Sequence, residues 1–187
     1  MRINGKAWQS IWLEDDGQTV GIIDQTKLPH SFEIVRLTTA DEAVRAIREM
    51  LVRGAPLIGA TAAWGIFLGL LHDSSDAGLE SVCKKVLHAR PTAVNLRWAA
   101  ARMRTVLHSL PPQERIEAAR QEATALCEED VRVNEAIGEH GLRLIAEQYQ
   151  GTNRPLNILT HCNAGWLACV EYGTATAPMY AAFERGL

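Results

Sequence analysis

The stretch from Ala55 to Leu71 contains no charged residue, and this constrains the fold more than any other feature of the sequence. It is shorter than the roughly 20 apolar residues that a membrane-spanning helix needs. It is also rich in glycine, alanine and threonine, whose small side chains let neighbouring elements approach closely. A helix of this composition is expected to be buried on all sides in a protein core. We therefore predict a globular chain built around this helix, without membrane association.

One hairpin and several further helices are predicted around the central helix. Residues 8–13 and 19–23 are short apolar runs on either side of a polar turn that ends at Gly17, which is typical of a β-hairpin. Thr39, with Glu42 three residues later, forms a capping box that predicts a helix start. This helix is expected to end near residues 53–54, and others are expected over 56–72, 79–88, 93–109 and in long runs after 113, where Gly138 and Gly141 indicate close helix packing.

The C-terminal part of the chain has a different pattern. Residues 157–159 form a short apolar run behind Pro155 and predict a buried strand. A polar turn carrying His161 and Cys162 follows, and then a helical pattern that runs through Arg185. A strand, a polar turn and a helix in this order present reactive groups at the carboxyl edge of an α/β sheet.

The predicted fold class is therefore mixed α and β, with two domains. Residues 1–150 are expected to form an N-terminal domain made of a β-hairpin and helices. A polar linker over 150–155 separates it from residues 151–187, which are expected to form the first β–α unit of an incomplete Rossmann-like domain.

Composition and motif spacing argue against several classes of protein. The formal net charge is −3 and no basic block occurs, so nucleic-acid binding is not expected. The four cysteines show no C-x-x-C spacing and the histidines no H-x-x-x-H spacing, so we expect neither a metal nor another cofactor. Scattered thiols are typical of a cytoplasmic protein. Residues 1–10 contain no apolar segment of the kind that secretory signals have.

Two arginines stand before prolines at predicted helix starts and suggest an anion site. Arg53 precedes Gly54-Ala55-Pro56, and Arg90 precedes Pro91. A helix N-terminus offers free N–H groups and a partial positive charge, glycine lets a ligand approach the backbone, and a guanidinium group binds phosphate. Two such starts make an anion site more credible than one. The alternatives are a plain corner between helices at the first and a helix cap formed by Thr92 at the second.

Cys162 is the candidate reactive group. In an extended segment its side chain and that of His161 would point to opposite faces, so this pair is not expected to form an imidazole-activated thiolate. Cys162 could act as a neutral general acid or as a thiolate stabilised by nearby cations, or it could be a packed core cysteine. Candidate carboxylates are Asp41, Asp130 and Glu171, although Asp130 lies in an acidic run typical of a solvated helix face.

Five segments stand in the order found in one enzyme family. They are Asp-Gln-Thr-Lys-Leu-Pro at 24–29, Arg-Gly-Ala-Pro-Leu-Ile-Gly at 53–59, Arg-Pro-Thr-Ala-Val-Asn-Leu at 90–96, Thr-His-Cys-Asn-Ala-Gly at 160–165 and Glu-Tyr-Gly-Thr-Ala at 171–175. In these segments, and over nearly its whole length, the chain resembles the S-methyl-5-thioribose-1-phosphate isomerases of methionine salvage. That family is related to the regulatory subunits of eukaryotic initiation factor 2B and to ribose-1,5-bisphosphate isomerase.

The resemblance implies an aldose–ketose isomerisation of 5-methylthioribose 1-phosphate to 5-methylthioribulose 1-phosphate. A cysteine and an aspartate take the acid–base roles in this family, and Cys162 matches the catalytic cysteine. Arg53, Gly54, Ala55 and Arg90 match positions that bind the phosphate and sugar of the substrate. Family members are about twice this length because of a larger Rossmann-like domain, so the aspartate is expected beyond Leu187.

Two functions are compatible with these observations. The chain is part of an isomerase for a sugar 1-phosphate, completed by a second chain or acting as a homodimer, or it is a non-catalytic regulatory or interaction protein. The cysteine favours the first, because a regulatory protein has no chemical need for that thiol. The 5-substituent of the sugar is left open, with 5-deoxyribose 1-phosphate as an alternative substrate.

Overall fold

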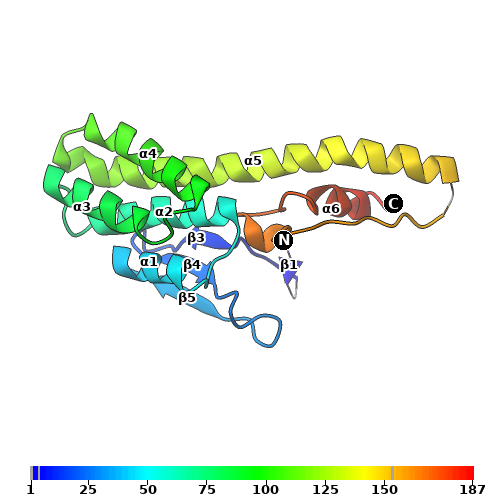
Figure 1. Cartoon of the computed structure of the whole chain (residues 1–187), viewed down its shortest axis with the longest axis horizontal. Coiled ribbons are helices and arrows are strands. Elements are labelled where there is room, and N and C mark those ends of the chain that lie inside the picture. Colours follow the sequence, from blue (N-terminus) through cyan, green and yellow to red (C-terminus); the bar gives the residue numbers. More distant parts are fainter. Residues whose placement is uncertain (1, 4, 153) are drawn as a thin grey trace.

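The computed structural model describes residues 2–3, 5–152 and 154–187. Within these ranges a small antiparallel sheet lies beneath a group of helices, and one long helix, α5 (Pro112–Thr152), runs along the molecule (Figure 1). The mixed α and β class is thus confirmed. No helix in the described part of the chain is both long and apolar enough to cross a membrane.

The uncharged stretch forms α2 (Ala55–Leu70), with its proline in the first turn, at the centre of the core. Its residues from Leu57 to Leu68 are all buried, as predicted. Gly65 contacts Ala43 and Gly69 contacts Val82, so the absent side chains bring neighbouring helices close. The helices packed against α2 are α1 (Ala40–Arg48), α3 (Asp76–Leu87), α4 (Val94–His108) and α5.

The predicted hairpin consists of strands β3 (Ile11–Leu13) and β4 (Val20–Ile23), which pair in antiparallel fashion. A third strand, β5 (Ile34–Leu37), pairs with β4 and was not predicted from the sequence. The strand order is β3-β4-β5, and a separate two-stranded ribbon of β1 (Arg2–Ile3) and β2 (Lys6–Ala7) precedes it.

The predicted capping box starts α1. The Thr39 hydroxyl accepts a hydrogen bond from the Glu42 N–H at 3.2 Å, and the Glu42 carboxylate accepts one from the Thr39 N–H at 3.1 Å. The helix ends at Arg48 and not near 53–54 as predicted. The intervening turn contains two residues with left-handed backbone angles, Met50 at φ 61° and Gly54 at φ 99°, which an α-helix cannot contain.

The long helical pattern after residue 113 forms one continuous helix, α5, which includes the first residues of the predicted linker. Asn153 lies outside the described residues, so the domain boundary stays a prediction. The C-terminal helix α6 (Ala177–Glu184) lies against α5 (Figure 1). Its Ala177 carbonyl approaches Gly138 and its Pro178 ring approaches Gly141, so the glycines permit the close packing expected from the sequence.

The prediction of a buried strand over 157–159 is wrong for this structure. These residues form no strand, and the Leu159 side chain is 97% exposed. A strand requires a neighbour for its backbone N–H and C=O groups, and no described segment supplies one beside it. The chain instead returns along α5 as an extended segment, drawn in yellow-orange in Figure 1, and reaches the short 3-10 helix η1 (Trp166–Ala168).

The central position of α2 leads to a stability prediction. Replacing Phe67, which is fully buried in α2, by alanine should lower the free energy of unfolding by about 3–5 kcal/mol, because it leaves a cavity in the core. The matched control is Phe183→Ala on α6, where the ring is 81% exposed and the loss should be small. Urea unfolding of both variants measures the difference, and equal losses would contradict the placement of α2 at the centre.

Candidate functional site

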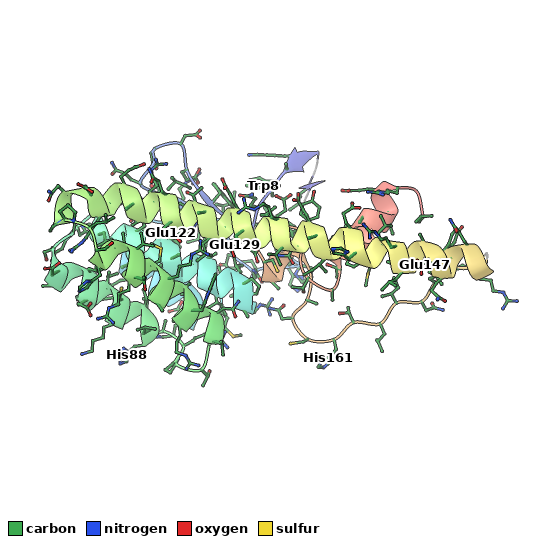
Figure 2. All side chains as sticks on the ribbon, turned by 90° about the horizontal axis from the view of Figure 1, so that it is seen from above. Trp8, His88, Glu122, Glu129, Glu147 and His161 are labelled. Carbon is green, nitrogen blue, oxygen red and sulfur yellow. The ribbon has the colours of Figure 1, made fainter. Side chains whose placement is uncertain are left out.

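Cys162 lies on an exposed turn. Its backbone φ of 71° falls in the left-handed region, which residues with a side chain seldom adopt, and the Ala164 N–H closes the turn by donating to the Cys162 carbonyl at 3.0 Å. Figure 2 shows the neighbouring His161 on a loop that projects away from α5. The thiol is therefore presented to solvent, and the interpretation of Cys162 as a packed core cysteine is wrong.

The other three cysteines have a different environment. Burial raises the pKa of the Cys83 and Cys169 thiols to about 11 and that of the Cys127 thiol to about 12. At neutral pH these thiols are protonated and inert towards electrophiles. Cys162 is thus the exposed thiol among the four cysteines, which suits a reactive role.

The base of the Cys162 loop is closed by contact between two glycines. A Cβ added to Gly173 would lie 1.9 Å from the carbonyl carbon of Gly165, so the two backbones touch at this point. The Ala177 N–H then donates to the Gly173 carbonyl at 2.8 Å, where α6 begins. We name residues 160–176, from the cysteine turn to this point, the cysteine loop.

Gly54, in segment 53–59, contacts the cysteine loop. It is the N-cap of α2 and has a φ of 99°, and an added Cβ would lie 2.4 Å from both Cα and the carbonyl oxygen of Ala168. Glycine is therefore needed here for two reasons, the left-handed backbone and the contact with η1. The turn before α2 and the segment after Cys162 lie directly against each other.

Gly59, also in segment 53–59, contacts segment 90–96. An added Cβ would lie 3.2 Å from the carbonyl oxygen of Asn95 in the first turn of α4, so the second turn of α2 is in contact with the first turn of α4. Neither helix has a side-chain hydrogen bond at its N-cap, which is Ala93 in α4. The predicted cap by Thr92 is therefore wrong, and Pro91 lies in the turn before α4 and not in its first helical turn.

Segment 53–59 thus contacts Ala168 of the cysteine loop through Gly54 and Asn95 of segment 90–96 through Gly59. The candidate side chains are placed as follows. Arg53 is exposed, and its Nη2 donates to the Gln25 carbonyl at 3.4 Å. Arg90 is half-buried and Ala55 is exposed. That Arg53 and Arg90 share one anion, and that Cys162 is catalytic, stay predictions.

Three polar residues hold the cysteine loop in place, and two of them, Ser10 and Gln25, were not assigned to the site from the sequence. The Ser10 N–H donates to the Val170 carbonyl at 2.9 Å, and the Gln25 side-chain amide donates to the Leu167 carbonyl at 2.6 Å. The Asp130 carboxylate accepts a hydrogen bond from the Val170 N–H at 2.8 Å. Gln25 lies in segment 24–29, which resembles the isomerase family, so the sequence could have indicated a role for it. Ser10 lies in none of the five segments.

The placement of Asp130 corrects its interpretation as part of a solvated helix face. It is half-buried beneath the cysteine loop, and burial raises the pKa of its carboxyl group, against the opposing effect of hydrogen bonds from Val170 and Asn134. The other two candidate carboxylates also have partners. Asp41 pairs with Lys85 at 2.8 Å, and Glu171 accepts a hydrogen bond from the Gln9 amide at 3.5 Å.

Two further observations delimit the site. A cavity of about 420 Å³ between β3 and α5 is lined by Trp12, Trp64 and Cys127 among others, and by no residue of the three motifs. In the described residues no group of three or more histidine, cysteine or acidic side chains is arranged to hold a metal ion.

Comparisons with known proteins agree on one group. Residues 51–186 match the initiation factor 2 subunit family. The whole chain is 55% identical to the methylthioribose-1-phosphate isomerase of Paramagnetospirillum magneticum and 56% identical to that of Acidiphilium cryptum, covering 52% and 51% of their lengths. The chain thus spans about half the length of the curated relatives it matches.

Two solved structures are similar to most of the chain. The crystal structure of 5-methylthioribose 1-phosphate isomerase from Pyrococcus horikoshii has a TM-score of 0.83 and 32% identity, over 97% of this chain and 51% of that one. The structure of translation initiation factor eIF-2B subunit delta from A. fulgidus has a TM-score of 0.81 and 34% identity, over 96% and 52%.

The contact between Gly54 and Ala168 can be tested by substitution. Gly54→Ala should cost about 1–2 kcal/mol for the left-handed backbone and about 1–3 kcal/mol more for the clash with η1. Gly17→Ala is the matched control, because Gly17 also has a left-handed φ, 69°, but nothing lies within 4 Å of an added Cβ. Chemical denaturation measures both, and equal losses would show that the contact is absent.

Proposed function

Because the chain belongs to the initiation factor 2 subunit family, we propose that it supplies the phosphate-binding residues and the catalytic cysteine of an isomerase. The reaction is the conversion of 5-methylthioribose 1-phosphate to 5-methylthioribulose 1-phosphate. The observation that carries this proposal is that both arginine-bearing segments and the cysteine loop, with its exposed Cys162, are in backbone contact at α2, where Gly54 meets Ala168 and Gly59 meets Asn95. Identity of 55% and 56% to methylthioribose-1-phosphate isomerases, over the whole chain, supports the choice of substrate.

The phosphate on C1 of the sugar determines which chemical steps the site must catalyse. It blocks the anomeric carbon, so the ring cannot open as a free hemiacetal does, and an acid must protonate the ring oxygen. As the bond between C1 and the ring oxygen breaks, a hydrogen must move from C2 to C1, and the C2 hydroxyl must give its proton to a base, which leaves the C2 carbonyl of the ketose. We assign acid–base catalysis to Cys162, whose exposed turn gives the thiol access to a bound sugar.

The same proposal assigns the phosphate to the two helix starts. The N–H groups at the beginning of α2 and α4 have no side-chain cap, and they carry the partial positive charge of a helix N-terminus. Arg53 and Arg90 add guanidinium groups that bind phosphate oxygens in pairs. Gly54 and Ala55 would contact the phosphate and sugar through their backbone.

For the fold we propose that residues 1–150 are one domain and that 151–187 begin a Rossmann-like one. Leu156 and Ile158 line a cavity of about 450 Å³ against α5 and α6, while Leu159 points to solvent. Ile158 is also 48% exposed, so both faces of this segment, which forms no strand here, are open to neighbours. Sheet neighbours from a second chain, or from a second copy in a homodimer, would pair the exposed backbone and cover Leu159.

The second candidate function is a non-catalytic regulatory subunit. It is favoured by the similarity to translation initiation factor eIF-2B subunit delta, whose TM-score nearly equals that of the isomerase. The two functions differ in their need for the thiol at position 162.

A complementation assay separates them. We expect the chain to show little isomerase activity by itself and to gain it when mixed with the part of the Paramagnetospirillum relative that it does not cover. In the mixture, Cys162→Ser should lower kcat by about 10²–10⁴-fold, because a serine hydroxyl transfers protons poorly, and should change phosphate affinity little. Cys127→Ser is the control for thiol loss elsewhere. Activity that survives Cys162→Ser would exclude the proposed catalytic role.

The phosphate site has a separate test. Arg53→Ala and Arg90→Ala should each weaken binding of inorganic phosphate to the chain by about tenfold, the loss expected for one charge-assisted contact. Arg120→Ala is the control, because Arg120 pairs with Glu117 on the surface of α5. Titration followed by phosphorus NMR measures the affinities. If both variants bind as the control does, neither arginine contributes to an anion site.

A further inference from the structure

We propose that Gln25 is a positioning residue that couples the phosphate-binding turn, residues 51–54, to the cysteine loop. The roles given to the phosphate-binding turn and the cysteine loop rest on the proposed function, whereas the contacts of Gln25 are observed independently of it. Gln25 belongs to the matched segment 24–29, to which the proposed reaction assigns no role. It also lies outside residues 51–186, which carry the family match.

The contacts of Gln25 reach both parts at once. Its side chain is buried, with the residue 2% exposed, and its Nε2 donates to the Leu167 carbonyl at 2.6 Å. Its backbone N–H donates to the Leu51 carbonyl at 2.9 Å, and its own carbonyl accepts from Arg53 Nη2 at 3.4 Å. One residue therefore bonds to both ends of the turn before α2 and to η1 of the cysteine loop.

The local structure fixes Gln25 in this position. The neighbouring Asp24 carboxylate accepts hydrogen bonds from the Thr26 N–H at 2.9 Å and the Thr26 hydroxyl at 2.6 Å, which forms a side-chain-closed turn. The Asp24 N–H donates to the Glu33 carbonyl at 3.0 Å, just before β5 begins. The turn is thus attached to the ends of β4 and β5, and Gln25 projects from a rigid base.

The bond to Leu167 lies beside the contact made by Gly54. Gly54 touches Ala168, the next residue along η1, so the phosphate-binding turn meets the cysteine loop by a steric contact and by a hydrogen bond through Gln25. A shift of either part must move Gln25 or break one of its bonds. The position of Arg53 and that of Cys162 are then not independent, which is what a site binding one substrate between them requires.

The chemistry of the side chain explains why an amide suits this position. Glutamine offers a neutral N–H donor to the Leu167 carbonyl. Glutamate has the same shape, but as a carboxylate it is an acceptor and would face that carbonyl with a negative charge. When ionised, the Gln25→Glu side chain therefore removes the bond with little change in volume, and Gln25→Ala removes the whole contact at any pH.

The experiment measures the coupling without substrate. Hydrogen exchange is followed in the chain and in Gln25→Glu and Gln25→Ala, and we expect exchange to rise about tenfold in residues 51–56 and 164–170 together, with α3 and α4 unchanged. The control is Gln9→Ala, because the Gln9 amide bonds to Glu171 of the same loop but not to the turn before α2. A uniform rise over all helices, or no rise in 164–170, would overturn the proposal.

A kinetic measurement separates this inference from the proposed function. In the complementation mixture, Gln25→Glu should lower kcat about tenfold with a smaller change in KM, because the reacting groups are misaligned. A variant that only loses stability would lower the amount of active enzyme and recover on cooling, which would contradict positioning. If the unsubstituted mixture is inactive while the exchange result holds, the coupling by Gln25 stands and the proposed reaction fails.

Discussion

The close approach of backbones at the start of α2 is the constraint on which the rest of the site depends. Gly54 lets the turn before the helix touch η1, and Gly59 lets the helix touch the first turn of α4. The Gly54 contact excludes a Cβ, because an added one would lie 2.4 Å from the Ala168 backbone, whereas at Gly59 it would lie a tight 3.2 Å from the Asn95 carbonyl oxygen. The burial of α2 on all sides makes this meeting point rigid, because the helix cannot move without disturbing the core.

Around this point the structure separates reactive groups from the groups that hold them. Cys162 and Arg53 are exposed, whereas Ser10 and Gln25, which hydrogen-bond to residues 166–170 of the cysteine loop, are buried. Asp130 supports the cysteine loop from α5, although burial raises the pKa of its carboxyl group. Buried polar groups of this kind are tolerated when each has a partner, and they then define one geometry. The left-handed turn at Cys162 is closed by its own hydrogen bond from the Ala164 N–H to the Cys162 carbonyl.

Local patterns in the sequence correctly predicted those structural elements that depend on residues close together in the chain. The capping box at Thr39, the hairpin around Gly17 and the buried helix after Pro56 all rest on contacts within a few positions. The run over 157–159 has the composition of a strand, but a strand also needs a partner, which the described residues do not supply. Gln25 and Asp130 act on segments more than a hundred and about forty positions away, respectively, and no periodicity reports such contacts.

The central claim is that the two arginine-bearing segments and the cysteine loop form one anion site. A crystal of the chain grown with selenate, a tetrahedral stand-in for phosphate whose selenium is located by anomalous scattering, tests it directly. The account predicts one selenate bound by the guanidinium groups of both Arg53 and Arg90, at the start of α2 and on the side that Cys162 faces. Selenate bound elsewhere, with the two arginines pointing to opposite sides of the molecule, would contradict the account.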